Sequence, residues 1–108
     1  MNGLTHIDFA RFEASATQAA TLLKALSNEK RLMILCRLGE GELQSGALCP
    51  LVGLSQSALS QHLALLREEG VVATRREGQA IFYRIADPAV VRIIATLAGI
   101  FNPPSPEL

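Results

Sequence analysis

The segment L-S-Q-S-A-L-S-Q-H-L-A-L-L-R-E-E-G, at residues 54–70, carries the signals of one complete short helix. Ser55 is a favourable N-cap, because its hydroxyl oxygen accepts a hydrogen bond from a free backbone N–H of the first turn. Gly70 suits the position just beyond the end, since glycine adopts the left-handed conformation without a steric penalty. Three leucines at helical spacing predict the buried stripe of this helix: Leu59, Leu63 and Leu66.

The opposite face of this predicted helix is small and uncharged. It presents, again at helical spacing, Ser57, Ser60, Gln61 and Ala64. An ordinary solvated helix face more often carries charged side chains such as lysine and glutamate. A helix that enters the major groove of DNA needs small side chains for close approach, and amide or hydroxyl groups that hydrogen-bond base edges. We therefore interpret this segment as a candidate recognition helix.

The chain has 108 residues, which is enough for one domain with one modest core. Hydrophobic residues make up 49% of it, which indicates a globular fold rather than disorder. The ten basic and ten acidic residues cancel, so any contact with nucleic acid must come from a local basic patch. With two cysteines and no secretory signal, we expect a cytoplasmic protein with reduced thiols. The apolar run at residues 90–101 is shorter than the ~20 residues that a membrane span needs, so we expect no membrane contact.

Upstream of the recognition helix, the spacing of apolar residues predicts three further helices. The first runs over residues 9–26, after a loose lead-in at residues 1–8. Ser27 is the expected N-cap of the second helix, and Ser45 is the expected N-cap of a short third helix that ends at Gly53. Because a tight turn joins the third helix to the recognition helix, the pair is a predicted helix-turn-helix.

Downstream of Gly70 the apolar pattern changes to a period of two. Residues 71–74 and 80–85 are predicted strands, joined by the turn R-R-E-G-Q at residues 75–79. A hairpin directly after a recognition helix is a wing, and arginines at its tip can reach phosphates or the minor groove. Arginines also decorate ordinary solvated turns, but the neighbouring helix favours the DNA interpretation.

The last predicted helix, at residues 88–101, starts with Asp87 as its N-cap and Pro88 at its first position. It is apolar nearly all round, and in so small a domain a second subunit is the expected cover. Residues 102–108 form a predicted disordered tail. The predicted DNA-binding and dimerisation domain therefore spans residues 9–101.

Three motifs in this order resemble the ArsR/SmtB family of winged helix-turn-helix repressors, and most closely its branch with HlyU, NolR and BigR. The motifs are L-S-N-E-K-R-L-M-I-L (26–35), L-S-Q-S-A-L-S-Q-H-L-A-L-L-R (54–67) and R-R-E-G-Q-A-I-F-Y-R (75–84). The resemblance covers nearly the whole chain. It implies a mainly α fold with a small β-hairpin, a homodimer through the first and last helices, and binding of an inverted-repeat operator in double-stranded DNA.

Residue matching to this family places the DNA contacts on the recognition helix and the wing: Gln56, Ser57, Ser60, Gln61, His62, Arg75, Arg76 and Gln79. Lys30 and Arg31, in the first turn of the second predicted helix, are either solvated charges or neighbours of the phosphate backbone. His62 also has two interpretations. It donates to a phosphate or a base, or it packs at the helix edge beside Leu65 or Leu66, which we favour.

The chain departs from the metal-sensing members of the family. Their Cys-x-Cys pair near the start of the third helix is replaced here by Gln44 and Gly46, and no histidine follows Asp87 in the last helix. Because a lone thiolate without neighbouring ligands is a poor metal site, we expect no metal ion and no other cofactor.

The chain also departs from the sulfide- and oxidant-responsive members. Cys36 matches their second-helix cysteine, but Asn102 stands where the resemblance puts the partner cysteine, at the end of the last helix. Cys36 is therefore either a small buried hydrophobe next to Leu35 and Leu38, which we favour, or a redox-sensing thiol, alone or with Cys49.

The sequence thus predicts a sequence-specific DNA-binding repressor that is a homodimer, with a thiol or persulfide response through Cys36 as a candidate input. A repressor without an inducer that regulates its own promoter is the alternative within DNA binding. A winged-helix adaptor for protein partners is the alternative from another class. An enzyme is not expected, because the sequence offers no nucleophile–base pair, no paired carboxylates and no phosphate-binding loop.

Overall fold

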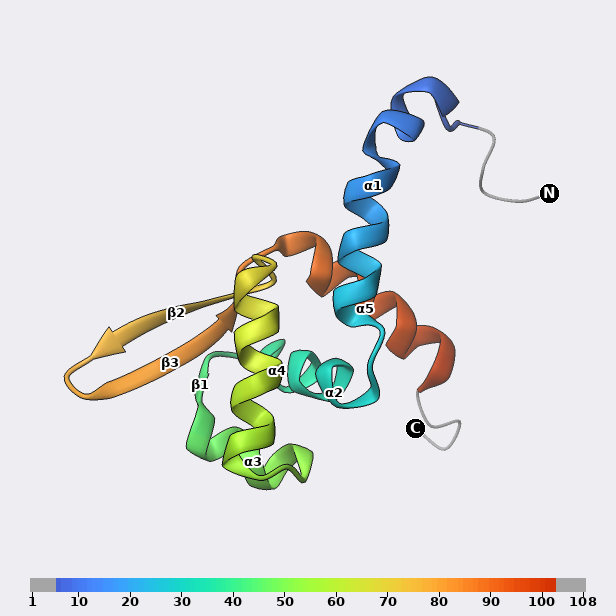
Figure 1. Ribbon diagram of the computed structural model, residues 1–108. Coiled ribbons are helices and arrows are strands. Elements are labelled where there is room, and N and C mark those ends of the chain that lie inside the picture. The colour runs from blue at the N-terminus through green and yellow to red at the C-terminus, as the bar shows by residue number, and fades with distance from the viewer. Residues whose placement is uncertain (1–5, 103–108) are drawn as a thin grey trace.

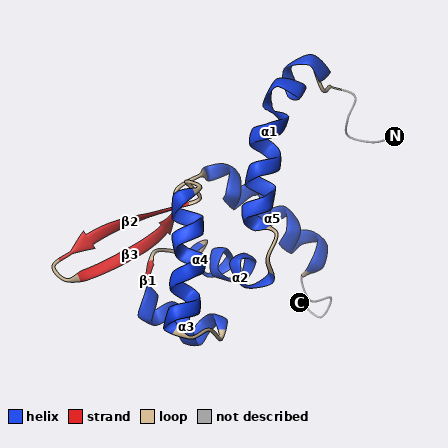
Figure 2. Cartoon of the chain, viewed as in Figure 1, coloured by secondary structure: helices blue, strands red, loops and turns tan. Residues whose placement is uncertain are grey.

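The computed structural model describes residues 6–102, which fold into five helices and three strands (Figure 1, Figure 2). In chain order these are α1 (Phe9–Leu26), α2 (Glu29–Leu38), β1 (Leu43–Gln44), α3 (Ser45–Val52), α4 (Gln56–Glu68), β2 (Val72–Glu77), β3 (Ala80–Ile85) and α5 (Pro88–Phe101). The predicted mainly α winged helix-turn-helix is therefore confirmed. Among the described residues, no helix has the combination of length and apolarity that crossing a membrane requires. The predicted lead-in and tail fall largely outside the described residues, so both stay predictions.

The hydrophobic core is one cluster to which all five helices and the strand β2 contribute. The predicted leucine stripe of α4 is confirmed, since Leu59, Leu63 and Leu66 are each at most 1% exposed. Apolar side chains from the rest of the fold complete this core: Ala25, Leu26, Ile34, Leu35, Leu38, Leu48, Val52, Val71, Val72 and Val90. Gly53 makes the tight turn between α3 and α4 at a φ of 69°, a left-handed conformation that strains residues with a side chain.

Two helix starts follow the predicted capping side chains. The hydroxyl of Ser55 accepts a hydrogen bond from the backbone N–H of Ala58 (3.2 Å), which caps α4. The carboxylate of Asp87 accepts one from the backbone N–H of Ala89 (2.9 Å), which caps α5. Both predicted caps are therefore confirmed.

The predicted caps of α2 and α3 are wrong. Asn28, not Ser27, caps α2, because its extended backbone places Oδ1 where it accepts from the N–H groups of both Lys30 (2.9 Å) and Arg31 (3.0 Å). Ser45 is the first residue of α3 rather than its cap, and the residue before it makes no side-chain capping bond.

A third strand, β1, joins the wing, and the sequence did not predict it. The sheet is antiparallel with strand order β1-β3-β2, and β1 pairs Leu43 with Tyr83 and Gln44 with Phe82. A strand of two residues is too short to show a period of two. Its pairing ties the segment before α3 to the central strand of the wing.

The wing strand β2 is longer than predicted. It extends to Glu77 instead of ending at residue 74, so Arg75 and Arg76 lie within the strand and not in the turn. The turn consists of residues 78–79 and uses the left-handed conformation of Gly78 (φ 63°). Strand pairing therefore determines the direction in which each arginine points.

The helix α1 and the wing extend in different directions from the body formed by α2, α3 and α4 (Figure 1). Two of the connections are short, since only residues 27–28 separate α1 from α2 and only residues 86–87 separate the wing strand β3 from α5. Large apolar side chains of α1 and α5 stay exposed, and we call them the apolar surface of α1 and α5: Phe9, Phe12, Leu23, Val91, Ile100 and Phe101.

Candidate nucleic-acid interface

The exposed face of α4 has the character predicted from the sequence. Ser57, Ser60, Gln61 and Ala64 are all exposed, on the side of α4 away from its leucine stripe. None of the side-chain hydrogen bonds within residues 6–102 uses the amide of Gln61. That amide therefore offers both a donor and an acceptor to a ligand such as a base edge.

Gln56, by contrast, is held by its own chain at the N-terminal end of α4. Its Oε1 accepts a hydrogen bond from the thiol of Cys49 (3.3 Å), and its Nε2 donates to the hydroxyls of Ser45 (3.3 Å) and Ser60 (3.4 Å). This network joins α3 to α4 and orients the hydroxyl of Ser60 on the exposed face. The predicted DNA contact by Gln56 stays a prediction.

The two wing arginines lie on opposite faces of the hairpin. Strand residues alternate between faces, and the pairing sets Arg75 opposite Phe82 and Arg76 opposite Ile81. Arg75 stacks over the ring of Phe82 (4.5 Å to the ring centroid), and its Nε donates to Oε1 of Glu42 (2.6 Å). This hydrogen bond lowers the pKa of Glu42 and raises the pKa of Arg75. Arg75 is therefore engaged within the chain, where it ties the wing to the residue before β1.

Arg76 lies on the other face of the hairpin, which also carries Tyr83. Between α4 and β3 there is a groove of about 460 Å³, lined by Ser60, Leu63, Ala64, Arg67, Glu68 and Tyr83. The small polar face of α4 and this face of the wing therefore border one space. Sequence reasoning missed Arg67 and Tyr83 here. Helical spacing could have found Arg67, because it lies one turn beyond Ala64.

The basic residues at the start of α2 are also engaged within the chain. Nζ of Lys30 donates to the backbone carbonyl of Val52 (2.8 Å), at the end of α3. Nε of Arg31 donates to the carbonyl of Ala25 (2.6 Å), at the end of α1, and Nη1 lies 3.5 Å from Nδ1 of His62. Desolvation, together with the charge of Arg31, lowers the pKa of the half-buried His62. His62 is half-buried and lies beside Arg31, whereas its packing beside Leu65 or Leu66 and the DNA contacts by these three residues stay predictions.

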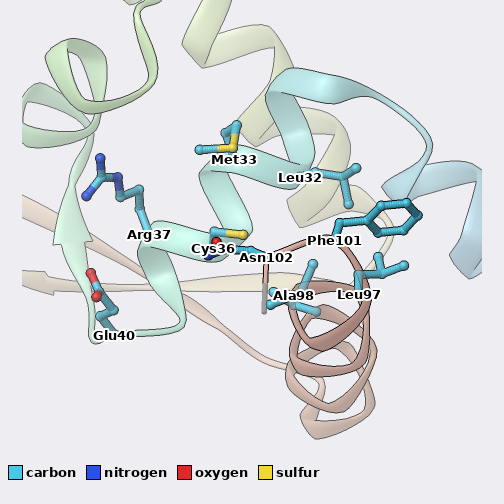
Figure 3. Close-up of a pocket in the computed structure, with 10 residues that line it drawn as sticks. Leu32, Met33, Cys36, Arg37, Glu40, Leu97, Ala98, Phe101 and Asn102 are labelled. Carbon is cyan, nitrogen blue, oxygen red and sulfur yellow. The ribbon is translucent and has the colours of Figure 1, made fainter. Parts of the chain in front are cut away.

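Cys36 is exposed, so the expectation of a buried thiol is wrong. The buried positions of α2 include Leu35 and Leu38, and Cys36 lies on another side of the helix. It lines an apolar pocket of about 540 Å³ between α2 and α5, across from Leu97 and Phe101 (Figure 3). Over residues 6–102, no three Cys, His, Asp or Glu side chains gather closely enough to hold a metal ion.

Comparison with known proteins connects these features to one family. A family model described as the bacterial regulatory protein, arsR family, matches residues 28–74, which run from the cap of α2 into β2. The HTH-type transcriptional regulator YgaV of Escherichia coli K12 is 50% identical over 97 residues, which cover 89% of this chain and 98% of that protein.

Solved structures lead to the same conclusion. The transcriptional repressor BigR from Xylella fastidiosa is similar with a TM-score of 0.83 at 41% identity, over 88% of this chain and 97% of that one. The homodimeric winged helix-turn-helix DNA-binding domain of Mb0332 from Mycobacterium bovis has a TM-score of 0.74 at 36% identity, over 93% and 89% of the two chains. This chain therefore belongs to the ArsR family of winged helix-turn-helix transcriptional regulators.

Proposed function

We propose that this chain is a homodimeric transcriptional repressor that acts in the cytoplasm on an inverted-repeat operator. Each subunit inserts α4 into the major groove of one half-site, and its wing contacts the adjacent DNA backbone. The two-fold symmetry of the dimer requires half-sites that lie about one helical turn apart, or a multiple of that distance. The proposal includes no metal ion and no other cofactor.

The observation that carries this proposal is the exposed, uncharged face of α4 beside the wing. Its hydroxyl and amide groups hydrogen-bond base edges, and its small side chains permit close approach to the groove floor. Glutamine is a typical bidentate partner of adenine, and the amide of Gln61 is exposed. Arg76 and Gln79 are exposed on the wing and supply candidate phosphate contacts at its edge.

The apolar surface of α1 and α5 supports the homodimer. Phe9 and Phe101 are 72% and 79% exposed in the single chain. Soluble proteins seldom leave large apolar side chains uncovered in such number, and a second copy in two-fold symmetry covers them. The neighbour from Mycobacterium bovis is itself homodimeric. We expect light scattering to give the mass of a dimer at micromolar concentration, and a monomeric mass would remove the basis for the inverted repeat.

Paired variants separate base reading from phosphate contact. Gln61→Ala should reduce the preference for the operator over scrambled DNA by at least about fivefold, because a good base contact is worth ~1–3 kcal/mol of discrimination. Arg76→Ala should weaken binding to both DNAs alike and flatten its salt dependence. Arg75→Ala is the matched control. The guanidinium of Arg75 is paired with Glu42 in the wild type, so its removal should leave the salt slope nearly unchanged.

Fluorescence anisotropy with the chain's own upstream region and a scrambled duplex measures these effects. Equal losses on both duplexes for Gln61→Ala would refute the division between base reading and phosphate contact. Under the proposal, charge reversal at Arg75 and Arg76 abolishes DNA binding. In a winged-helix adaptor, the same reversal leaves binding to a protein partner largely intact. A wild-type chain with no preference between the two duplexes would refute the repressor itself.

The exposed position of Cys36 favours a thiol input as a second candidate property. Hydrogen peroxide converts a thiol to a sulfenic acid with release of water, and a sulfane sulfur donor transfers one sulfur atom to give a persulfide. Release of the operator after either treatment by the wild type, but not by Cys36→Ser, would support this input. Unchanged binding by both proteins would support a repressor without a thiol inducer.

A further inference from the structure

One side chain, that of Arg31 in α2, contacts both α1 and α4. Its Nε donates a hydrogen bond to the carbonyl of Ala25 (2.6 Å), and its Nη2 donates to that of Lys24 (3.4 Å). On the other side, Nη1 lies 3.5 Å from Nδ1 of His62. Lys24 and Ala25 belong to the last turn of α1, and His62 belongs to α4. Arg31 therefore bridges the candidate recognition helix and the end of a helix that carries part of the apolar surface.

The chemistry of this bridge suits a guanidinium better than an ammonium. Carbonyl groups in the last turn of a helix lack intrahelical partners and carry a partial negative charge. A guanidinium presents five N–H donors in a planar fork, so it serves two carbonyls and a third acceptor at once, whereas an ammonium is a point charge. The third acceptor must be a neutral His62 with a free lone pair at Nδ1, and its lowered pKa favours that neutral form.

The backbone of Arg31 is fixed as well. Its N–H donates to Oδ1 of Asn28 (3.0 Å), which caps α2 and is the second residue of the two-residue connection from α1. Asn28 therefore fixes the backbone of Arg31, and the carbonyls of α1 hold its guanidinium. The guanidinium reaches α4 through its contact with His62. Gln61 is the sequence neighbour of His62, so a displacement of His62 also displaces the exposed face of α4.

We propose that Arg31 is a positioning residue that sets the orientation of α4 relative to α1, and that it does not contact phosphate. This inference rests on the proposed function, because it concerns a dimer that reads two half-sites at once. In such a dimer α1 lies at the interface, and each recognition helix is fixed to that interface through Arg31. The preferred distance between half-sites therefore depends on this side chain.

Three variants take the bridge apart in different ways. Arg31→Lys keeps the charge but not the fork, and Arg31→Gln removes both. His62→Phe leaves the hydrogen bonds from Arg31 to α1 in place and removes the polar contact between Arg31 and α4. For each variant, the affinity is measured for an operator with the native distance between half-sites and for operators in which that distance is changed by one base pair. Each measurement is repeated over a series of salt concentrations. The measurements use a temperature at which unfolding curves show that every variant is folded and light scattering gives the mass of a dimer.

All three variants are expected to lose preference for the native spacing by about two- to thirty-fold, which is the usual size of coupling through a packed network. In the two Arg31 variants, the slope of log affinity against log salt should remain that of the wild type, because no phosphate contact is lost. The matched control, Arg76→Ala, should lower this slope and keep the spacing preference. A merely structural role for Arg31 would change the unfolding curves without changing the spacing preference.

Two results would overturn the inference while the wild type still binds its operator. A slope that falls by about one for each lost contact in Arg31→Gln would identify Arg31 as a phosphate contact. A retained spacing preference in Arg31→Lys or His62→Phe would show that the bridge does not position α4. Failure of the proposed function itself has a different signature, because the wild type would then show no preference for the operator, and the inference would fall with it.

Discussion

Leu63→Ala removes a buried side chain that holds the candidate recognition helix against the core. Leu63 is 1% exposed and lies between Leu59 and Leu66 in the buried stripe of α4. Truncation of a fully buried leucine costs roughly 2.7–5 kcal/mol, because the transfer free energy is lost and a cavity remains. The better helix propensity of alanine returns only a few tenths of this amount. We therefore expect the free energy of unfolding to fall by about 3 kcal/mol, a large share of the ~5–15 kcal/mol of a typical domain.

Leu65→Ala is the matched control for this variant. It makes the same chemical change two residues further along α4, but Leu65 is 37% exposed. Less apolar area is lost and water fills the space, so we expect a loss of about 1 kcal/mol or less. The assay is urea denaturation followed by circular dichroism at one protein concentration, because dimerisation makes apparent stability depend on concentration. Equal losses for the two variants would refute the assignment of the core-facing side of α4.

Asn28→Ala removes the cap of α2 and should lower the free energy of unfolding in urea by about 1 kcal/mol, whereas an equal loss for Ser27→Ala would contradict the cap assignment. Gly53→Ala forces a side chain into the left-handed region and should cost roughly 1–2 kcal/mol in the same assay. Its control, Gly46→Ala, has open space around the new methyl group and should cost nothing. Because the pKa of His62 is lowered in the folded chain, the unfolded chain takes up the proton first. Acidification below the ordinary value of 6.5 should therefore reduce the free energy of unfolding. His62→Gln should flatten this part of the pH profile, and an unchanged profile would count against the pKa assignment.

The candidate recognition helix could be predicted because its signals are local. Ser55, the leucine stripe and Gly70 lie within one segment, and each acts over one or two helical turns. The exposure of Cys36 could also have been predicted, since the buried positions 34, 35 and 38 leave it on another side of α2. Its apolar character and its buried neighbours favoured the wrong expectation.

The features that could not be predicted depend on residues far apart in the chain. The strand β1 exists only because β3 pairs with it, and the partner of Arg75 is Glu42, which lies 33 residues away. The first turn of α2 shows two basic residues in the sequence, but only the packing of α1 and α4 gives Arg31 its acceptors. Ser27 and Asn28 are both good caps by residue type, and backbone geometry decides between them.

The two-residue connections at residues 27–28 and 86–87 determine where a chain of this architecture can change in length during evolution. An inserted residue at either place would rotate the DNA-binding part against α1 or α5, and in a dimer both half-sites would be misplaced at once. The turn at residues 78–79 is exposed and joins only the two strands of the wing, so an insertion there would lengthen the hairpin alone. Insertions and deletions among related chains should therefore collect at the end of the wing and be purged from the two connections.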